Sequence, residues 1–297
     1  MKKFFKYLVT GLIFLLFLFS CQNQKKPDTD KDAAASDKPH ISVSIPPLKW
    51  ITEKIAGSDF IVTSVVSSNI SPELFDPSVK TIEELEKSDL YFSFDLFAFE
   101  HKLEDAVSNP GKIHNVLENN SYFIKEDKNA HAEDGHSHGD YDPHVWFSMN
   151  IDSLIAENVK NVLSEKYPDK KDIFEKNYYN FISEINTFKG ELKESLDNKK
   201  SKIFVIYHPA LTYFAKEYGL TQISIEQEGK EPTAQYLQTV ISEIKKNNVM
   251  VLLVQPQFPK SSVELISKEV PGIKIIEFNP LEENIFENLK TLTDSLE

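Results

Sequence analysis

The chain has 297 residues, a formal net charge of −13, one cysteine and no arginine. A strongly acidic protein is a poor partner for nucleic acids, and the lack of arginine disfavours binding of phosphate, amino acids or sugar acids, since the guanidinium fork is the usual group that pairs with such anions. With a single cysteine, any metal site has to be built from histidine, carboxylate and amide ligands.

The N-terminus has the pattern of a bacterial lipoprotein signal. Lysines precede the apolar run 7–19, which is shorter than the roughly 20 residues that span a bilayer, so residues 1–20 are predicted to be a signal peptide. The run ends at Leu18-Phe19-Ser20-Cys21, which resembles a lipobox and predicts lipidation of Cys21. A plain secretory signal with an incidental cysteine, or a retained membrane anchor, is the alternative. We expect an extracytoplasmic protein anchored to a bacterial membrane through this lipid.

Residues 21–39 are predicted to be a disordered tether. They are polar and contain no aromatic or β-branched aliphatic residue from position 22 to 38, so they cannot bury enough apolar surface to become ordered. The folded body is expected to begin near His40.

The body alternates between strand and helix patterns. Strands are expected at 41–45, 60–66, 90–94, 202–207, 222–225 and 249–254. Helices are expected between them at 48–56, 81–88, 211–217 and 237–245. This alternation indicates α/β architecture with parallel sheets.

The two halves of the body correspond at a fixed offset of sequence position. Pro47 and Gly57 in the first half match Pro209 and Gly219 in the second, within the same order of strand, proline, helix, glycine and strand. We therefore expect two similar α/β lobes, an N-terminal lobe at 40–166 and a C-terminal lobe at 199–297.

A long helix is predicted to join the lobes at 167–198. Apolar residues recur there three or four positions apart, which places them on one face of a helix. At 1.5 Å per residue the helix would be about 45 Å long, so it could run along both lobes and limit their relative motion. The residues of this stripe are Phe174, Tyr178, Phe181, Ile185, Phe188 and Leu192.

Histidines gather in a polar loop at 127–141, which contains His131, His136 and His138 among acidic residues. Imidazole and carboxylate groups are suitable ligands for Zn²⁺ and related ions. The loop is therefore predicted to be an accessory metal-collecting segment, and an acidic solvated loop is the alternative.

Three further segments carry candidate site residues. His144 stands in Asp-Pro-His-Val-Trp directly after this loop, and His208 follows an apolar strand, where open α/β sheets bind their ligands. Glu73 lies in a loop with two prolines after the second strand. Each has a structural alternative when taken singly, a packed histidine or an exposed acidic turn.

Together these motifs resemble the zinc/manganese solute-binding proteins of ABC importers. The resemblance extends from about Ile41 to the C-terminus and includes the segments 142–146, 207–220 and 229–232. It implies two α/β lobes joined by a long rigid helix, with a metal cleft between the lobes. It also implies that His144 and His208 are metal ligands that face each other. Glu73, where the family has histidine, and Asn279, where the family has aspartate, are the two further candidate ligands.

The resemblance implies an extracytoplasmic lipoprotein that captures Zn²⁺ for an ABC importer permease, acts as a monomer and is not an enzyme. Mn²⁺ or Fe²⁺ as the transported ion is the first alternative. An adhesion or organic-ligand-binding lipoprotein is another, and a zinc hydrolase is a third, although the sequence has no HExxH motif.

Overall fold

The computed structural model describes residues 38–118, 120–125, 141–226 and 230–296. Pro39–Glu297 forms one compact unit. The predicted signal peptide, Cys21, nearly all of the tether, and His131, His136 and His138 lie outside the described residues. Among those described, no helix is both long and apolar enough to cross a membrane.

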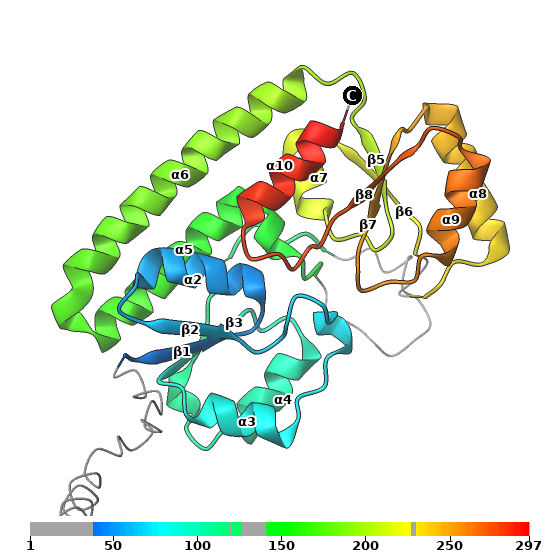
Figure 1. Ribbon diagram of the computed structural model, residues 1–297. Helices are drawn as coiled ribbons and strands as arrows, with labels where there is room; N and C mark the ends of the chain where they lie inside the picture. Colours follow the sequence, from blue (N-terminus) through cyan, green and yellow to red (C-terminus); the bar gives the residue numbers. More distant parts are fainter. Residues whose placement is uncertain (1–37, 119, 126–140, 227–229, 297) are drawn as a thin grey trace, which may run out of the picture. The chain divides into compact units, whose positions relative to one another are not determined.

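The secondary structure alternates between short strands and helices along the compact unit (Figure 1). The elements are β1 (His40–Val43), α2 (Pro46–Ala56), β2 (Ile61–Ser64), η1 (Pro72–Leu74), α3 (Val79–Glu86), β3 (Leu90–Ser93), α4 (Ala98–Ala106), η2 (Pro110–Lys112), β4 (Ile113–Asn115), η3 (Val145–Phe147), α5 (Met149–Lys166), η4 (Pro168–Lys170), α6 (Lys171–Asp197), β5 (Ile203–Ile206), α7 (Thr212–Tyr218), β6 (Thr221–Ser224), α8 (Ala234–Asn247), β7 (Val251–Val254), α9 (Ser261–Glu269), β8 (Lys274–Glu277) and α10 (Ile285–Ser295), where η marks a 3-10 helix.

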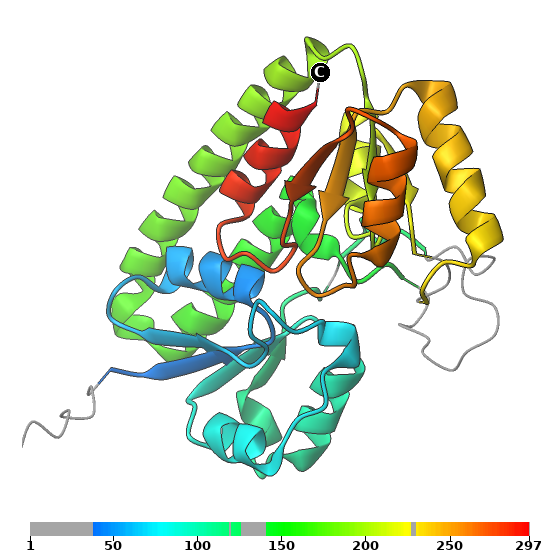
Figure 2. The same ribbon diagram turned by 45° about the vertical axis from the view of Figure 1, so that its right-hand side comes forward.

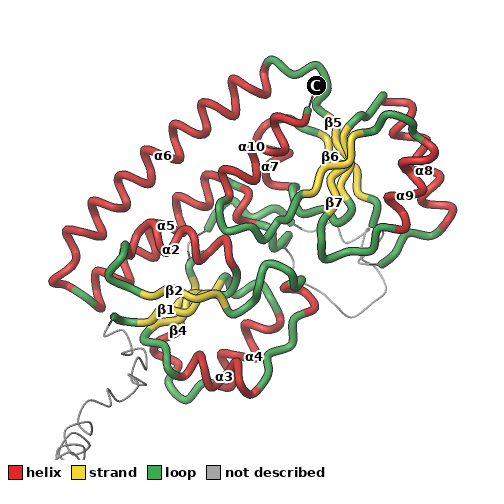
Figure 3. Tube along the Cα trace, viewed as in Figure 1, coloured by secondary structure: helices red, strands yellow, loops and turns green. Residues whose placement is uncertain are grey.

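The strands form two separate parallel sheets, which confirms the predicted α/β class (Figure 3). Their orders are β2-β1-β3-β4 and β6-β5-β7-β8, so the same topology occurs twice. We call the parts that hold the first and second sheet the N-terminal and C-terminal lobes. In each sheet all strand pairs are parallel, so all carboxyl ends of a sheet meet at one edge.

The internal repeat is visible in the backbone as well. Helices α2 and α7 are each followed by a glycine, Gly57 with φ of 74° and Gly219 with φ of 65°. An L-residue with a Cβ is strained at such a positive φ, so glycine suits the chain reversal that leads into β2 and β6. A glycine with positive φ therefore recurs at the same point of the repeated topology.

Most predicted element ends differ from the observed ones by one to three residues. The helix predicted at 81–88 shows why: it begins at Val79, because Ser78 is the N-cap and its hydroxyl accepts a hydrogen bond from the Thr81 amide. Thr81 returns the contact by accepting from the Ser78 amide. Two hydroxyl residues three positions apart thus form a cap that starts the helix two residues earlier than predicted.

Each sheet is covered by helices on both faces, as parallel sheets usually are. In the C-terminal lobe, Val205 and Leu252 pack with α8 and α9, whereas Phe204 and Ile206 belong to the core shared with α7 and α10. That second core is continuous with the buried residues of the N-terminal lobe. The lobes are therefore joined by packed apolar side chains as well as by the chain itself.

Helix α6 has 27 residues and is about 40 Å long at 1.5 Å per residue. It lies along α5 and α2 of the N-terminal lobe and along α10 of the C-terminal lobe (Figures 1 and 2). Of its predicted apolar stripe, Tyr178 is partly buried and the other members are buried. The predicted long connecting helix is thus confirmed, and it begins at Lys171, after the short helix η4.

Candidate metal centre

Glu73 reaches the site from the loop after β2. It is the middle residue of η1, which begins at Pro72. Proline suits the first position of a helix, since its fixed φ is helical and its missing amide hydrogen is not needed there. The Glu73 side chain is only 14% exposed, so the turn presents its carboxylate inward.

His144 is held by the residue two positions before it. The Oδ1 atom of Asp142 accepts hydrogen bonds from the backbone amide and from Nδ1 of His144, each at 2.9 Å. Because Nδ1 is engaged in this bond, Nε2 is the ring nitrogen that can bind a ligand. The main-chain carbonyl of Asp142 in turn accepts from the Tyr213 hydroxyl at 2.9 Å, which ties this loop to α7 of the C-terminal lobe.

His208 stands directly beyond β5 and is fixed from three sides. Its amide donates to Oε1 of Gln255 at 2.7 Å, and Nε2 of Gln255 donates back to its carbonyl at 3.0 Å. Its Nδ1 donates to Oε2 of Glu226 at 2.7 Å. The ring also stacks on Phe258, with centroids 5.2 Å apart. Again Nε2 is the atom left for a ligand.

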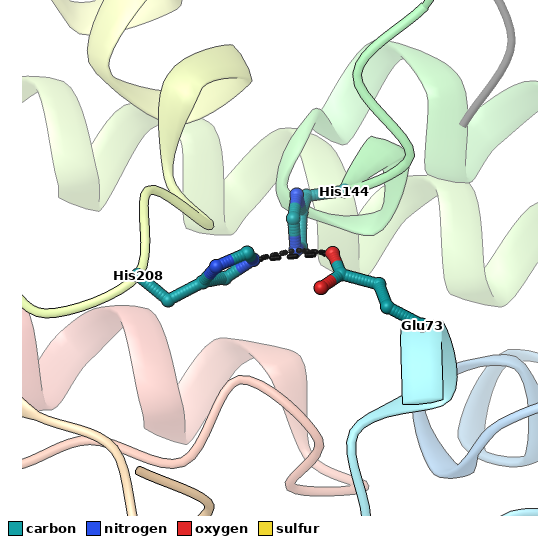
Figure 4. A group of neighbouring side chains, drawn as sticks. All are labelled: Glu73, His144 and His208. Atoms are coloured by element: carbon teal, nitrogen blue, oxygen red, sulfur yellow. Dashed lines mark hydrogen bonds and ion pairs between the residues drawn. The ribbon is translucent and has the colours of Figure 1, made fainter. Parts of the chain in front are cut away.

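The three candidate donor atoms converge on one point (Figure 4). His144 Nε2 and His208 Nε2 are 3.2 Å apart, and Oε1 of Glu73 lies 3.2 Å from His208 Nε2 and 3.7 Å from His144 Nε2. Ligands at about 2.0–2.1 Å in a tetrahedral zinc site are separated by about 3.3–3.4 Å. The spacing of the three atoms therefore fits such an ion with little rearrangement.

The donors open into a cavity of about 20 Å³, which is enough for about one water-sized occupant. Most of its wall is apolar, and the lining residues other than the three donors are Ser71, Pro72, Phe97, Trp146, Gln257, Phe258, Pro280 and Leu281. An apolar wall lowers the local dielectric and strengthens the attraction between the carboxylate and a bound cation.

Buried groups outside the cavity hold this wall in place. Glu100 is fully buried and accepts hydrogen bonds from the amides of Phe94, Leu96 and Phe97 at 2.9–3.0 Å, which fixes the loop that carries Phe97. Trp146 donates from Nε1 to the carbonyl of Pro280 at 2.9 Å. The hydrogen bond between Trp146 and Pro280 joins segments of the N-terminal and C-terminal lobes beside the cavity.

The electrostatics favour a positive charge among the donors. Burial opposes the charged form of His208, but the carboxylates of Glu73 and Glu226 outweigh it and hold the pKa of His208 well above its ordinary value. Burial likewise favours neutral Asp142, yet the contact with His144 keeps the pKa of Asp142 below its ordinary value. The site thus attracts a proton when it has no metal, and a divalent cation has to displace that proton.

Comparison with known proteins decides the family. The model of the family described as ZnuA, zinc-uptake complex component A, periplasmic, matches residues 41–297. The chain belongs to this family. The zinc-binding lipoprotein AdcA of Streptococcus pneumoniae is 29% identical over 285 residues, which cover 93% of this chain and 55% of that protein. The chain therefore spans about half the length of this relative.

In two further comparisons the match covers most of the length of both proteins. The high-affinity zinc uptake system protein ZnuA of Bacillus subtilis is 26% identical over 293 residues, 95% of this chain and 89% of that protein. A crystal structure of ZnuA superimposes with a TM-score of 0.78 at 31% identity, covering 86% of this chain and 97% of that one. The two-lobe fold of the ZnuA family is thus present.

Of the four predicted ligands in this ZnuA-family chain, the structure brings Glu73, His144 and His208 together from three separate segments. Asn279 follows β8 and is not among the described residues that line the cavity. Its Oδ1 accepts hydrogen bonds from Gln257 Nε2 at 2.7 Å and from the Leu281 amide at 3.1 Å. Asn279 therefore contacts Gln257, which lines the cavity, and helps to hold it in position.

Sequence reasoning missed Asp142, Glu226, Gln255 and Gln257 as members of the site. Glu226 follows β6, and the two glutamines follow β7. The rule that ligands bind beyond the carboxyl ends of strands led to the prediction of His208 as a site residue. The same rule applies to Glu226, Gln255 and Gln257. For Asp142, the signal was its position two residues before a candidate ligand.

A second group of potential donors lies in the N-terminal lobe. Asp95, His101 and Glu104 bring ligand atoms within 4.8 Å of one another, but Asp95 and His101 are exposed. Exposed side chains of this kind pair readily with each other and with water, so this group is a solvent-exposed control for the buried site.

Proposed function

We propose that this ZnuA-family chain is an extracytoplasmic lipoprotein that captures Zn²⁺ and delivers it to the permease of an ABC importer. The observation that carries the proposal is the convergence of two imidazole nitrogens and one carboxylate oxygen at zinc-like spacing beside a small, mostly apolar cavity. The relatives named for zinc binding and zinc uptake support the same ion.

The donor set favours Zn²⁺ over Mn²⁺. Imidazole nitrogen suits zinc, whereas Mn²⁺ prefers sites rich in oxygen ligands and octahedral geometry. Two of the three donors are nitrogens, and their separation matches a tetrahedral arrangement. Glu73, His144 and His208 are the proposed ligands.

The cavity also favours capture over catalysis. A hydrolytic zinc site needs an open coordination position with room for water and a substrate. A volume of about 20 Å³ leaves room for about one water-sized species. We propose that the chain acts as a monomeric carrier, anchored through Cys21, and that the loop histidines 131, 136 and 138 collect ions for the buried site.

The test is a titration of the metal-stripped protein with Zn²⁺ and Mn²⁺ in the presence of a competing chelator, beside His208→Ala and His101→Ala. We expect tight binding of about one Zn²⁺, weaker binding of Mn²⁺, loss of the tight phase in His208→Ala, and its retention in His101→Ala. Equal tight binding in His208→Ala would refute the assigned site.

Delivery is tested separately with the importer in proteoliposomes. The zinc-loaded protein is expected to stimulate ATP hydrolysis and Zn²⁺ uptake, whereas His208→Ala is not. If the wild type and His208→Ala both stimulate ATP hydrolysis and neither transfers metal, the proposed carrier role is contradicted.

A further inference from the structure

The three donors account for three positions of a tetrahedral ion, and Gln257 lines the same cavity. It lies just beyond β7, in the C-terminal lobe. Its Nε2 donates to the carbonyl of Ser68 at 2.7 Å and to Oδ1 of Asn279 at 2.7 Å. Its Oε1 is buried and has no hydrogen-bond partner among the residues that the structure describes.

The orientation of this amide is fixed by its neighbours. The Ser68 carbonyl can only accept, so the group that faces it has to be the NH₂ of Gln257. Asn279 is fixed in the same way, because its Oδ1 accepts from the Leu281 amide and its Nδ2 donates to the Ser68 carbonyl at 3.2 Å. Reversing the Gln257 amide would set oxygen against the Ser68 carbonyl oxygen, so its own oxygen is the atom left unpaired.

A buried carbonyl oxygen without a partner destabilises a protein, because it has lost its hydrogen bonds to water. An unpaired oxygen on a residue that lines the cavity is therefore a candidate for binding an ion. On the premise of the proposed function, we infer that Gln257 Oε1 is the fourth ligand of the captured ion, completing the set of Glu73, His144 and His208. In this assignment Asn279 holds Gln257 in position and does not itself contact the ion.

A neutral fourth ligand has a consequence for the strength of binding. Glu73 contributes the only negative charge among the four ligands, so a bound Zn²⁺ retains a net positive charge within its ligand sphere. The ion is held less strongly than by two carboxylates, which suits an ion that has to be passed on. Cation binding to Oε1 also polarises the amide and strengthens the donation from Nε2 to Ser68, a contact 189 positions away in sequence.

The experiment compares Gln257→Leu with Gln238→Leu, an exposed glutamine on α8. Gln257→Leu keeps the approximate size of the side chain and removes the oxygen. We expect its Zn²⁺ affinity to fall by at least about tenfold and the visible absorption bands of the Co²⁺-substituted protein to shift. Gln238→Leu should match the wild type in both measurements. Unchanged affinity and an unchanged Co²⁺ spectrum in Gln257→Leu would overturn the assignment.

A second measurement needs no variant and covers the case in which Gln257→Leu does not fold. Protein labelled with ¹³C at the glutamine side-chain carbonyl is titrated with Zn²⁺ and followed by infrared difference spectroscopy. Ligation is expected to shift one carboxamide band on addition of about one equivalent, and the absence of any shift contradicts it. Failure of the proposed function is a distinct result, since wild-type protein would then show no tight Zn²⁺ binding that depends on His208.

Discussion

The Nε2 atoms of His144 and His208 lie 3.2 Å apart, although the two residues are 64 positions apart in the chain and belong to different lobes. Two imidazole lone pairs repel each other at this distance unless a proton or a metal ion lies between or beside them. The structure therefore brings together two groups whose stable arrangement requires a positive charge, and several predictions depend on which charge is present.

Zinc affinity should depend on pH. Glu73 and Glu226 raise the pKa of His208 well above its ordinary value despite its burial, so the ring holds a proton at a higher pH than a free histidine does. Because Zn²⁺ has to displace that proton, affinity should fall as pH is lowered, and the fall should begin above the ordinary histidine pKa of about 6.5. Calorimetry in buffers of different ionisation enthalpy would measure the released proton; constant affinity and no proton release would contradict this.

Glu226→Gln should weaken Zn²⁺ binding by about tenfold or more, because groups that orient a metal-binding histidine typically contribute that much. It should also lower the pKa of His208, since one of the charges that raise it is lost. The fall in affinity on acidification should then occur at lower pH than in the wild type. Glu231→Gln, an exposed change in the same lobe, is the matched control, and identical pH profiles in all three proteins would exclude this role for Glu226.

Zinc should stabilise the fold, because the ligands come from segments that are distant in sequence. Binding to the folded state alone adds about 2.7 kcal/mol when the free ion is at about 100 times Kd. Thermal unfolding should therefore occur at higher temperature with Zn²⁺ and return to the metal-free value after chelation. His208→Ala should lose most of the increase. A similar increase in that variant would place the stabilising ion elsewhere.

Asp152 should make the protein less stable as pH rises. It is fully buried, its two carboxylate oxygens have no hydrogen-bond partner among the described residues, and burial, followed by the charge of Glu217, raises the pKa of Asp152 well above its ordinary value. Between its ordinary pKa and the raised one, the folded state holds a proton that the unfolded state has released. Stability therefore falls as pH increases through this window.

The corresponding test is Asp152→Asn, which cannot ionise. This variant should be more stable than the wild type near pH 7, and the difference should shrink as pH approaches 4. Denaturant unfolding at several pH values measures it, with the exposed Asp169→Asn as control. If the variant has lower stability than the wild type at every pH, ionisation of Asp152 is not the source of the pH dependence.

Lipidation at Cys21 should determine whether the protein is associated with the membrane. Expression in a bacterium with Cys21→Ser is expected to release it from the membrane fraction, because stable anchoring needs acyl chains. Incorporation of labelled palmitate into the wild type but not the variant provides the chemical readout. Equal membrane association of both proteins would show that another element anchors the chain.

The fold was largely predictable because its information is local. The alternation of apolar strands with amphipathic helices, and the glycines at 57 and 219, depend on neighbours in the sequence. The long helix followed from a stripe of apolar residues that is buried along α6. Element ends were less accurate, because caps such as Ser78 depend on side-chain hydrogen bonds that compete between adjacent positions.

The site was predictable in part. His144 and His208 stand in distinctive motifs, whereas Glu226 is one of 46 acidic residues and became recognisable only when β6 was placed beside β5. Gln257 was harder still. Its assignment depends on which end of its amide is left without a hydrogen bond, and that is set by Ser68 and Asn279, whose distances in sequence are 189 and 22 positions.

The packing of α6 limits how the ion can leave. Since this helix lies along both lobes and one core runs through both, separating the lobes would expose apolar surface that is now buried, at a large cost in free energy. Displacing the short turn that carries Glu73 exposes far less. The rate of metal exchange should therefore be governed by a few residues near positions 71–77, and in the proposed carrier role an importer would need to act on that one turn to take the ion.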